Sequence, residues 1–326
     1  MKLSARQGRS SDKLQVHGMA MTGKTETFAD LDARLRAILP EEYQDSYDDV
    51  QPVSMGSAGL KYGRDGRVAW NQMWATFCDL AMAGGPPHKG TLLTPAAAAA
   101  IEAEPERYEE VVDEICRGIW MVTDLVPEAS TRPGWISVPC STETMADWLL
   151  RAVVMENVAA RREGSHLELP AGPAFRIEKE IKNVVTVMAK TCHYWEGHMS
   201  PAQHRAIGHL LATMAAATPL ATPAMPSSAA NEDACRAAGA RMANRIQSTL
   251  GLPRSKGDQM GWLGVECPSV HAAVWLMRAL VVSNVLARRE GTALCVPIDP
   301  FQDPGGERVV TTLVHVHGLA KAGRVL

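Results

Sequence analysis

Hydrophobic and polar residues follow the same order in two stretches of this chain, residues 134–170 and residues 261–297. Each stretch opens with a short alternating segment headed by a tryptophan, Trp135 or Trp262, which predicts a strand. A segment with apolar residues at helical spacing follows, and two short strand-like segments around a Glu-Gly turn close the stretch. Each stretch therefore predicts a β-α-β-β unit.

The two stretches also match residue by residue at a constant offset of 127 positions. About half of the aligned positions are identical without a gap, including all of residues 161–164 against residues 288–291. A repeat of this length predicts a tandem duplication. We expect an α+β fold in which the two units pack about an approximate two-fold axis, inside a layer of helices.

Apolar residues at helical spacing predict the remaining elements. The expected helices cover residues 28–38, 68–83, 107–124, 174–198, 201–216, 230–250 and 307–320. We expect a disordered tail over residues 1–25, a region over 26–216 that contains the first unit, an Ala/Pro/Ser linker over 217–230, and a region over 231–326 that contains the second. The two regions are expected to pack as one body.

Composition narrows the class of protein. The chain has 33 Lys+Arg against 36 Asp+Glu and a sequence pI of about 6.4, which argues against a nucleic-acid partner. No apolar run reaches the roughly eighteen residues of a membrane span, so no membrane partner is expected. The seven cysteines form no C-x-x-C pair, and they predict the reduced thiols of a cytoplasmic protein.

One phosphate-binding pattern occurs in the predicted tail. Gly18, Gly23, Lys24 and Thr25 fit G-x-x-x-x-G-K-[ST]. The mechanism of that motif needs a buried strand before the loop and a parallel sheet behind it. Neither is predicted here, so we interpret the match as coincidence.

Two arginines occupy the same position in the two units, Arg151 and Arg278. A guanidinium group grips a carboxylate or phosphate with two hydrogen bonds, so the pair could hold an anionic substrate where the units meet. Neighbouring positions that we expect to face solvent differ between the copies, for example Glu156 against Ser283. The alternative is that each arginine pairs with a local acid such as Glu163 and braces its own unit, which is the commoner role.

The segment 174–198 carries a polar stripe. Asn183, Thr186, Lys190 and His193 fall at i, i+3, i+7 and i+10, which aligns them on one face of a helix. In a partly dry cavity Lys190 could act as a base or an imine-forming amine, and His193 suits general acid/base work. The second copy has His315 in place of Lys190, so such chemistry would be confined to one half. The alternative is an ordinary solvated helix face.

A turn rich in glycine and proline, residues 84–90, contains His88 and Lys89. Its positive tip could contact an anion, or the turn could simply end one helix and lead to the next. Cys78 and Cys192 lie in apolar helical patterns, which favour a place in the core.

Histidines near the end of segment 174–198 raise the question of a metal. The relevant residues are Cys192, His193, His198, His204 and His209. Intervals of five and six residues turn imidazoles apart on a helix, and no metal-ligand motif is present. The sequence therefore predicts no cofactor and no metal site, and leaves open only ligands gathered from distant segments.

These patterns lead to one main hypothesis and one alternative. The main hypothesis is an enzyme that acts on a small anionic metabolite by general acid/base chemistry in a cleft between the halves. Arg151, Arg278, Asn183, Thr186, His88 and Lys89 would bind the substrate, and Lys190 and His193 would move protons. Lyase, isomerase and transferase reactions all fit. The alternative is a non-catalytic ligand-binding or homo-oligomeric scaffold protein, for which a homodimer is one form.

Overall fold

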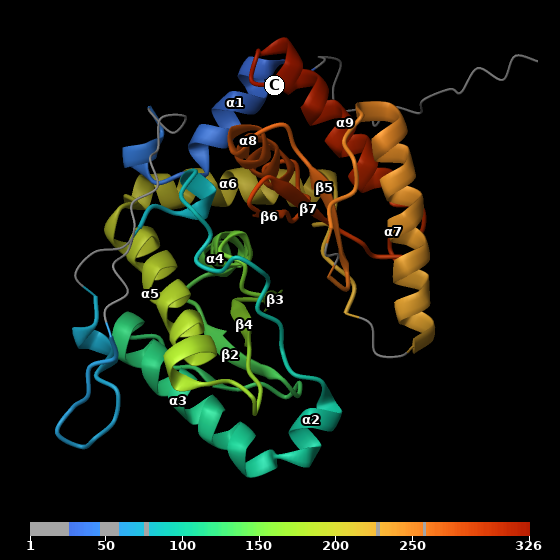
Figure 1. Ribbon diagram of the computed structural model, residues 1–326. Coiled ribbons are helices and arrows are strands. Elements are labelled where there is room, and N and C mark those ends of the chain that lie inside the picture. Colours follow the sequence, from blue (N-terminus) through green and yellow to red (C-terminus); the bar gives the residue numbers. More distant parts are fainter. Residues whose placement is uncertain (1–25, 46–58, 75–77, 226–228, 257–258) are drawn as a thin grey trace, which may run out of the picture.

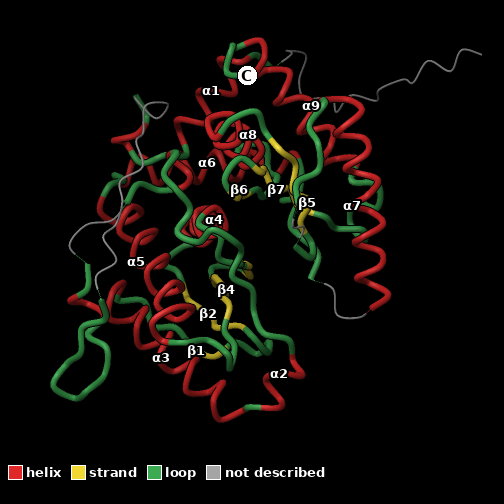
Figure 2. The backbone as a smooth tube through the Cα atoms, viewed as in Figure 1, coloured by secondary structure: helices red, strands yellow, loops and turns green. Residues whose placement is uncertain are grey.

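The computed structural model describes residues 26–45, 59–74, 78–225, 229–256 and 259–326. The fold is α+β: two small antiparallel sheets lie among helices (Figures 1 and 2). The predicted tail, with its phosphate-binding pattern, and the middle of the predicted linker lie outside the described residues.

The first sheet has the strand order β1-β2-β4-β3. A long helix, α4 (Glu143–Met155), connects β2 to β3, and the Thr142 side chain caps it by accepting a hydrogen bond from the backbone N–H of Met145. This is the β-α-β-β order predicted for residues 134–170. The strands are β1 (Glu128–Ala129), β2 (Trp135–Pro139), β3 (Arg161–Glu163) and β4 (His166–Pro170).

The second sheet has the order β5-β7-β6, and α8 (Val270–Val281), capped by Ser269, connects β5 to β6. Trp135 pairs with Pro170 in the first sheet, and Trp262 pairs with Pro297 in the second. The two sheets therefore share strand order and register at the same offset as the sequence repeat. The strands are β5 (Trp262–Glu266), β6 (Arg288–Glu290) and β7 (Ala293–Pro297).

An extended segment that sequence analysis did not predict lies beside each unit. Leu93 forms a parallel bridge to Val158, and Ala221 forms one to Val285. In both places a glycine is required: Gly134 and Gly261 have φ values of 86° and 78°. A Cβ atom on either glycine would come within 2.7 Å of a backbone carbonyl oxygen of the extended segment. The likeness of the two halves thus begins before the predicted repeat.

Helices enclose the two units in Figure 1. Helix α5 packs against α3 and α4, and α9 packs against α7 and α8. Helix α1 joins the halves, because Trp148 Nε1 donates to the carbonyl of Ile38 just after α1, while Phe28 at its start stacks on Trp275 at 5.8 Å. The helices are α1 (Phe28–Ala37), α2 (Ala98–Ala103), α3 (Pro105–Thr123), α5 (Lys182–Gly197), α6 (Pro201–Ala217), α7 (Ala229–Leu250) and α9 (Glu307–Ala322), with short turns η1 (Glu41–Tyr43), η3 (Trp70–Gln72), η4 (Ala81–Ala83) and η5 (Ile177–Ile181).

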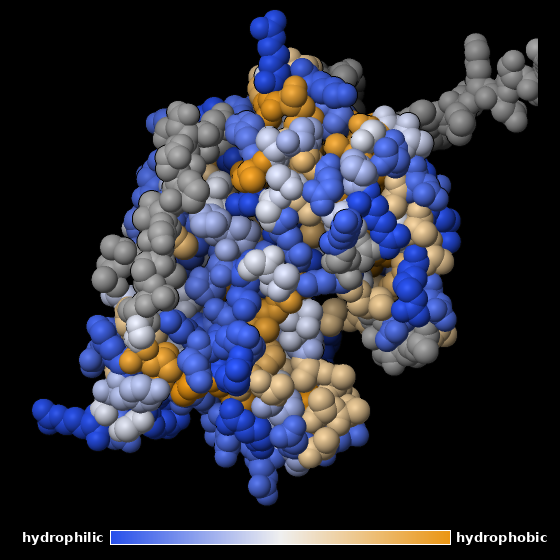
Figure 3. Space-filling view, viewed as in Figure 1, coloured by the Kyte–Doolittle hydropathy of each residue, from blue (hydrophilic) through white to orange (hydrophobic). Residues whose placement is uncertain are grey.

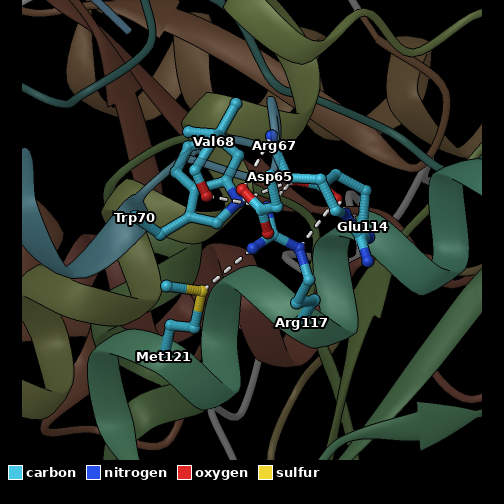
Figure 4. A network of polar contacts seen from close by, with 7 residues as sticks. All are labelled: Asp65, Arg67, Val68, Trp70, Glu114, Arg117 and Met121. Carbon is cyan, nitrogen blue, oxygen red and sulfur yellow. Dashed lines mark hydrogen bonds and ion pairs between the residues drawn. The ribbon is translucent and has the colours of Figure 1, made fainter. Parts of the chain in front are cut away.

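The helix predicted over residues 68–83 was wrong. The described part of this segment contains only the short turns η3 and η4. Its apolar residues are buried by tertiary contacts instead, as Figure 4 shows: Trp70 Nε1 donates to Glu114 Oε1 on α3 at 2.8 Å, and Arg67 and Arg117 both bond to the same carboxylate. Apolar residues that are buried against another element can fall at helical spacing, so this spacing alone does not distinguish them from the buried face of a helix.

The surface in Figure 3 is mostly hydrophilic, and its hydrophobic residues form small separate groups. The paler hydrophobic area near the bottom right covers α2, a short alanine-rich helix with no buried residues. No helix in the described part of the chain has the length and apolar character needed to cross a membrane.

The contact between α3 and α5 gives a sharp test of this packing. A Cβ atom on Gly118 of α3 would meet Val185 Cγ2 at 2.6 Å and Trp70 Nε1 at 3.2 Å, whereas one on Gly318 of α9 would meet nothing within 4 Å. We predict that Gly118→Ala destabilises the protein by about 1–3 kcal/mol through overpacking. Gly318→Ala should stabilise it by about 0.5–1 kcal/mol through helix propensity. Denaturant unfolding of both variants checks this, and equal effects would show that α3 and α5 are not in close contact.

Candidate functional site

Lys190 lies on α5 with its side chain completely buried. Its Nζ is 2.8 Å from Oε1 of Glu156, which is equally buried, and it donates to Cys78 Sγ at 3.2 Å. Burial alone would lower the pKa of this lysine, but the Glu156 carboxylate and the Cys78 sulfur outweigh it and raise the pKa above its ordinary value. Lys190 is therefore held as an ammonium ion, which disfavours the role of base or imine-forming amine expected for it.

Glu156 fixes the loop that covers Lys190. It stands at the end of α4, and its Oε1 and Oε2 accept hydrogen bonds from the backbone N–H groups of Ala81 and His88, each at 2.8 Å. Its own carbonyl accepts from the Lys89 N–H at 3.2 Å. The expectation that Glu156 faces solvent was wrong. One buried carboxylate satisfies a buried cation and two backbone donors at once.

His88 lies at the half-exposed edge of this arrangement. Its Nε2 is 3.1 Å from Asn183 Oδ1 on α5. Burial lowers the pKa of His88 to about 4; the Glu156 carboxylate opposes this shift and the Lys190 ammonium adds to it. The imidazole is therefore neutral at pH 7. We call Cys78, His88, Glu156, Asn183 and Lys190 the Lys190 cluster.

The predicted polar stripe on α5 divides between two surroundings. Asn183 and Lys190 belong to the cluster, and Thr186 between them is completely buried, with its hydroxyl donating to the Lys182 carbonyl at 2.6 Å. His193 is exposed at the far end of the helix, where its Nε2 is 3.0 Å from Nε2 of His198. The Lys190 end of the stripe is thus covered by the loop around His88, and the His193 end faces solvent.

The second unit also holds this loop. Arg289 of β6 is buried, and one of its terminal nitrogens donates to the Gly85 carbonyl at 2.8 Å. Asn157 donates from Nδ2 to the carbonyls of Lys89 and Arg289, both at 2.8 Å. Burial lowers the pKa of Arg289, and the Glu156 carboxylate opposes this shift. Lys190 and Arg289 are the two cations that act on Glu156, and Asp79 of the same loop is a second acid beside Tyr43 and Tyr194.

Buried arginines of both units build the joint between the units. Arg151 is completely buried, forms an ion pair with Asp147 on its own helix, and donates to Asn284 Oδ1 of the second unit at 2.7 Å. In the opposite direction Arg288 donates to Asn157 Oδ1 at 3.1 Å. Both asparagines end their helices with positive φ, 62° and 60°. These reciprocal contacts engage the Arg151 guanidinium in the joint.

Arg278 and the histidines at the end of α5 lie in surroundings that differ from those expected. Arg278 is buried on α8, as Arg151 is on α4, while Glu163, the acid suggested for bracing, pairs with Arg132. The argument that a five-residue interval separates imidazoles was wrong for His193 and His198. Helix α5 ends at Gly197, so His198 leaves the helical path and its ring returns toward His193.

Sequence analysis missed Cys78 and Glu156 as members of the site. A signal was present in the comparison of the two copies: Glu156 corresponds to Ser283 and Lys190 corresponds to His315, so both charged partners differ together. Cys192, assigned to the core with Cys78, is buried, and burial raises its pKa above the ordinary value. Cys78 is buried too, but beside an ammonium ion.

In the described part of the chain, no three side chains of the metal-binding types His, Cys, Asp and Glu gather as one ion would require. The comparisons with known proteins add no identity: no family model matches the chain, and searches of curated proteins and of solved structures found no significant match. The function must therefore be argued from the site itself.

Removal of one member of the buried ion pair should be strongly destabilising. We predict that Lys190→Met costs about 3–5 kcal/mol, because it leaves the Glu156 carboxylate buried without its cation. The double variant Lys190→Met/Glu156→Gln should cost less than this, because the neutral amide can still accept from one backbone donor. Denaturant unfolding of the two single variants and the double variant measures the coupling. If the loss of unfolding free energy in the double variant equals the sum of the losses in Lys190→Met and Glu156→Gln, the two side chains do not interact directly.

The neutral state of His88 predicts how stability depends on pH. Because the folded-state pKa lies below the unfolded value, the unfolded chain binds more protons between about pH 6.5 and pH 4, and stability falls as pH drops through this window. Gln at this position can replace the Nε2 donor but cannot titrate. We expect wild type to lose roughly 1–2 kcal/mol more than His88→Gln between pH 7 and pH 4.5. If urea unfolding shows that wild type and His88→Gln lose the same unfolding free energy over this pH range, the pKa of His88 is not lowered by folding.

Proposed function

We propose that this protein is an enzyme that acts on a small anionic metabolite by general acid/base chemistry at the Lys190 cluster. The observation that supports it is the buried Lys190–Glu156 pair beneath a half-exposed, neutral histidine. A buried ion pair is weak evidence for stability, because apolar residues of the same size would often stabilise the fold as well. Strongly perturbed groups of this kind gather at functional sites.

The geometry suggests a role for each group. With the Asn183 carbonyl facing the ring, Nε2 of His88 carries the proton and Nδ1 holds the lone pair that can accept one. The Lys190 ammonium and the Arg289 guanidinium would stabilise negative charge that develops on the substrate. Asn183 and Lys89, both half-exposed, would bind the substrate at the same edge. One acid/base group fits a lyase, an isomerase or a transferase.

Other predicted site residues receive different roles in this proposal. Arg151 braces the joint, Arg278 is buried on α8, and Thr186 packs within α5. His193 lies outside the reacting centre, and Lys190 acts as a fixed cation while His88 moves the proton. The Arg151 contacts with Asp147 and Asn284 support this revision.

We also infer that the two β-α-β-β units arose by duplication and pack about an approximate two-fold axis, with chemistry in the first half only. The shared register of the two sheets supports the duplication. The second half has Ser283 and His315 where the first has Glu156 and Lys190, and His315 is half-exposed and bonded to Glu26. The second copy would then serve to hold the loop of the first.

A second candidate is a non-catalytic ligand-binding or homo-oligomeric scaffold protein. The contacts Arg151–Asn284 and Arg288–Asn157 favour it, because they use one buried arginine from each half to hold the halves together. In either case the absence of disulfides among the seven cysteines supports a reducing, cytoplasmic setting.

Thermal unfolding in the presence of a panel of small carboxylates and phosphates tests the enzyme proposal. An anion that binds at this site, present at a concentration of 100 times its Kd, should stabilise the folded wild type by about 2.7 kcal/mol. This gain should disappear in His88→Gln and in Lys190→Met/Glu156→Gln. It should persist in His315→Met, the matched change in the second half.

Two results would overturn the enzyme proposal. One is stabilisation by an anion that is unaffected in both cluster variants, which would place the binding site elsewhere. The other is the absence of any stabilising anion together with a stable oligomer by light scattering, which would favour the scaffold.

A further inference from the structure

A pair of histidines at the exposed end of α5 has the geometry of two ligands of one ion. We propose that His193 and His198 bind a late first-row divalent ion, Ni²⁺, Cu²⁺ or Zn²⁺, through their Nε2 atoms. Imidazole is a preferred ligand of these ions. The site is separate from the Lys190 cluster and does not depend on the proposed function.

The distances between the two rings support a common ligand point. The Nε2 atoms are 3.0 Å apart and the ring centres are 4.7 Å apart. An ion about 2.05 Å from both nitrogens, with each ring centre about 1.15 Å behind its nitrogen, would place the centres about 4.7 Å apart. A head-on hydrogen bond of the same length would hold them about 5.3 Å apart. The rings are therefore inclined so that their nitrogens converge.

The angle at such an ion is also informative. Nitrogens 3.0 Å apart at about 2.05 Å from an ion subtend about 94° there, which suits neighbouring positions of a tetragonal or octahedral site. A tetrahedral Zn²⁺ would need them about 3.3 Å apart, a movement of a few tenths of an ångström. Both rings are on the surface, so this adjustment is available.

Glu42 supplies the supporting contact that metal-binding histidines usually have. Its Oε2 is 2.6 Å from Nδ1 of His198, so the carboxylate accepts the Nδ1 proton and leaves the Nε2 lone pair for the ion. Glu42 belongs to η1, which lies outside α5, so the contact fixes the ring against a second element. His193 is exposed on α5.

Two protein ligands leave the other positions of the ion open. Because the described residues offer no third ligand at this point, water or a carboxylate from another molecule would complete the coordination. The expected affinity is that of a surface chelate, below that of a closed structural zinc site.

Binding of Zn²⁺ to the full chain, measured by calorimetry, tests the proposal. We expect one site that is lost or at least tenfold weaker in His193→Gln and in His198→Gln. Glu42→Gln should weaken binding by about 10- to 100-fold while both ligands remain. His209→Gln, which changes an exposed histidine on α6, is the matched control and should bind as wild type does. Loaded with Cu²⁺, wild type should show an electron paramagnetic resonance signal with coupling to two imidazole nitrogens.

The variants also show which result would contradict the site. Zn²⁺ binding that is equal in wild type, His193→Gln and His198→Gln would place the ion elsewhere, as would an identical Cu²⁺ spectrum in all three. Absence of any Zn²⁺ binding to wild type would show that the two rings only share a hydrogen bond. Because His198→Gln and Glu42→Gln remove the contact between η1 and His198, the unfolding temperature of each variant is measured as well, and binding is compared at a temperature at which all of them are folded.

Discussion

The structure of the first half depends on one buried carboxylate. Glu156 ends α4, pairs with the Lys190 ammonium on α5, and accepts hydrogen bonds from both ends of the loop that contains η4 and His88. A buried carboxylate is costly unless it is paired and fully hydrogen-bonded, and here the cation comes from α5 while both backbone donors come from the loop. The loop, α4 and α5 must therefore adopt their positions together, and His88 is held at the surface as a consequence.

The joint between the two units is built from buried arginines that donate to asparagine side chains of the other unit. Arg151 reaches Asn284 of the second unit, and Arg288 reaches Asn157 of the first. Asn157 also holds the loop through the Lys89 carbonyl. Asn157 therefore links the joint to the loop, so a change in how the halves meet would move the loop that bears His88.

Local patterns in the sequence were sufficient for part of this account. The β-α-β-β elements and most long helices follow from periodicity, because each of them buries one face. Apolar residues therefore recur at every second position in a strand and at every third or fourth position in a helix. The interval argument failed at His198, where the helix ends, and the helix expected at residues 68–83 failed because Trp70 is buried by a distant partner, Glu114. Glu156 was misplaced for the same reason: a carboxylate at a helix end is usually solvated, and only its contacts with Lys190 and the loop reveal that it is buried.

The central claim is that Lys190 is a buried ammonium ion held by Glu156, and nuclear magnetic resonance of the side-chain nitrogen tests it directly. At neutral pH the ammonium protons of exposed lysines such as Lys321 exchange rapidly with water. The account predicts one slowly exchanging Lys Nζ signal at pH 7 that is absent from Lys190→Arg and is lost or shifted in Glu156→Gln. A Lys190 signal that exchanges as fast as that of Lys321, or one with the chemical shift of a neutral amine, would contradict it.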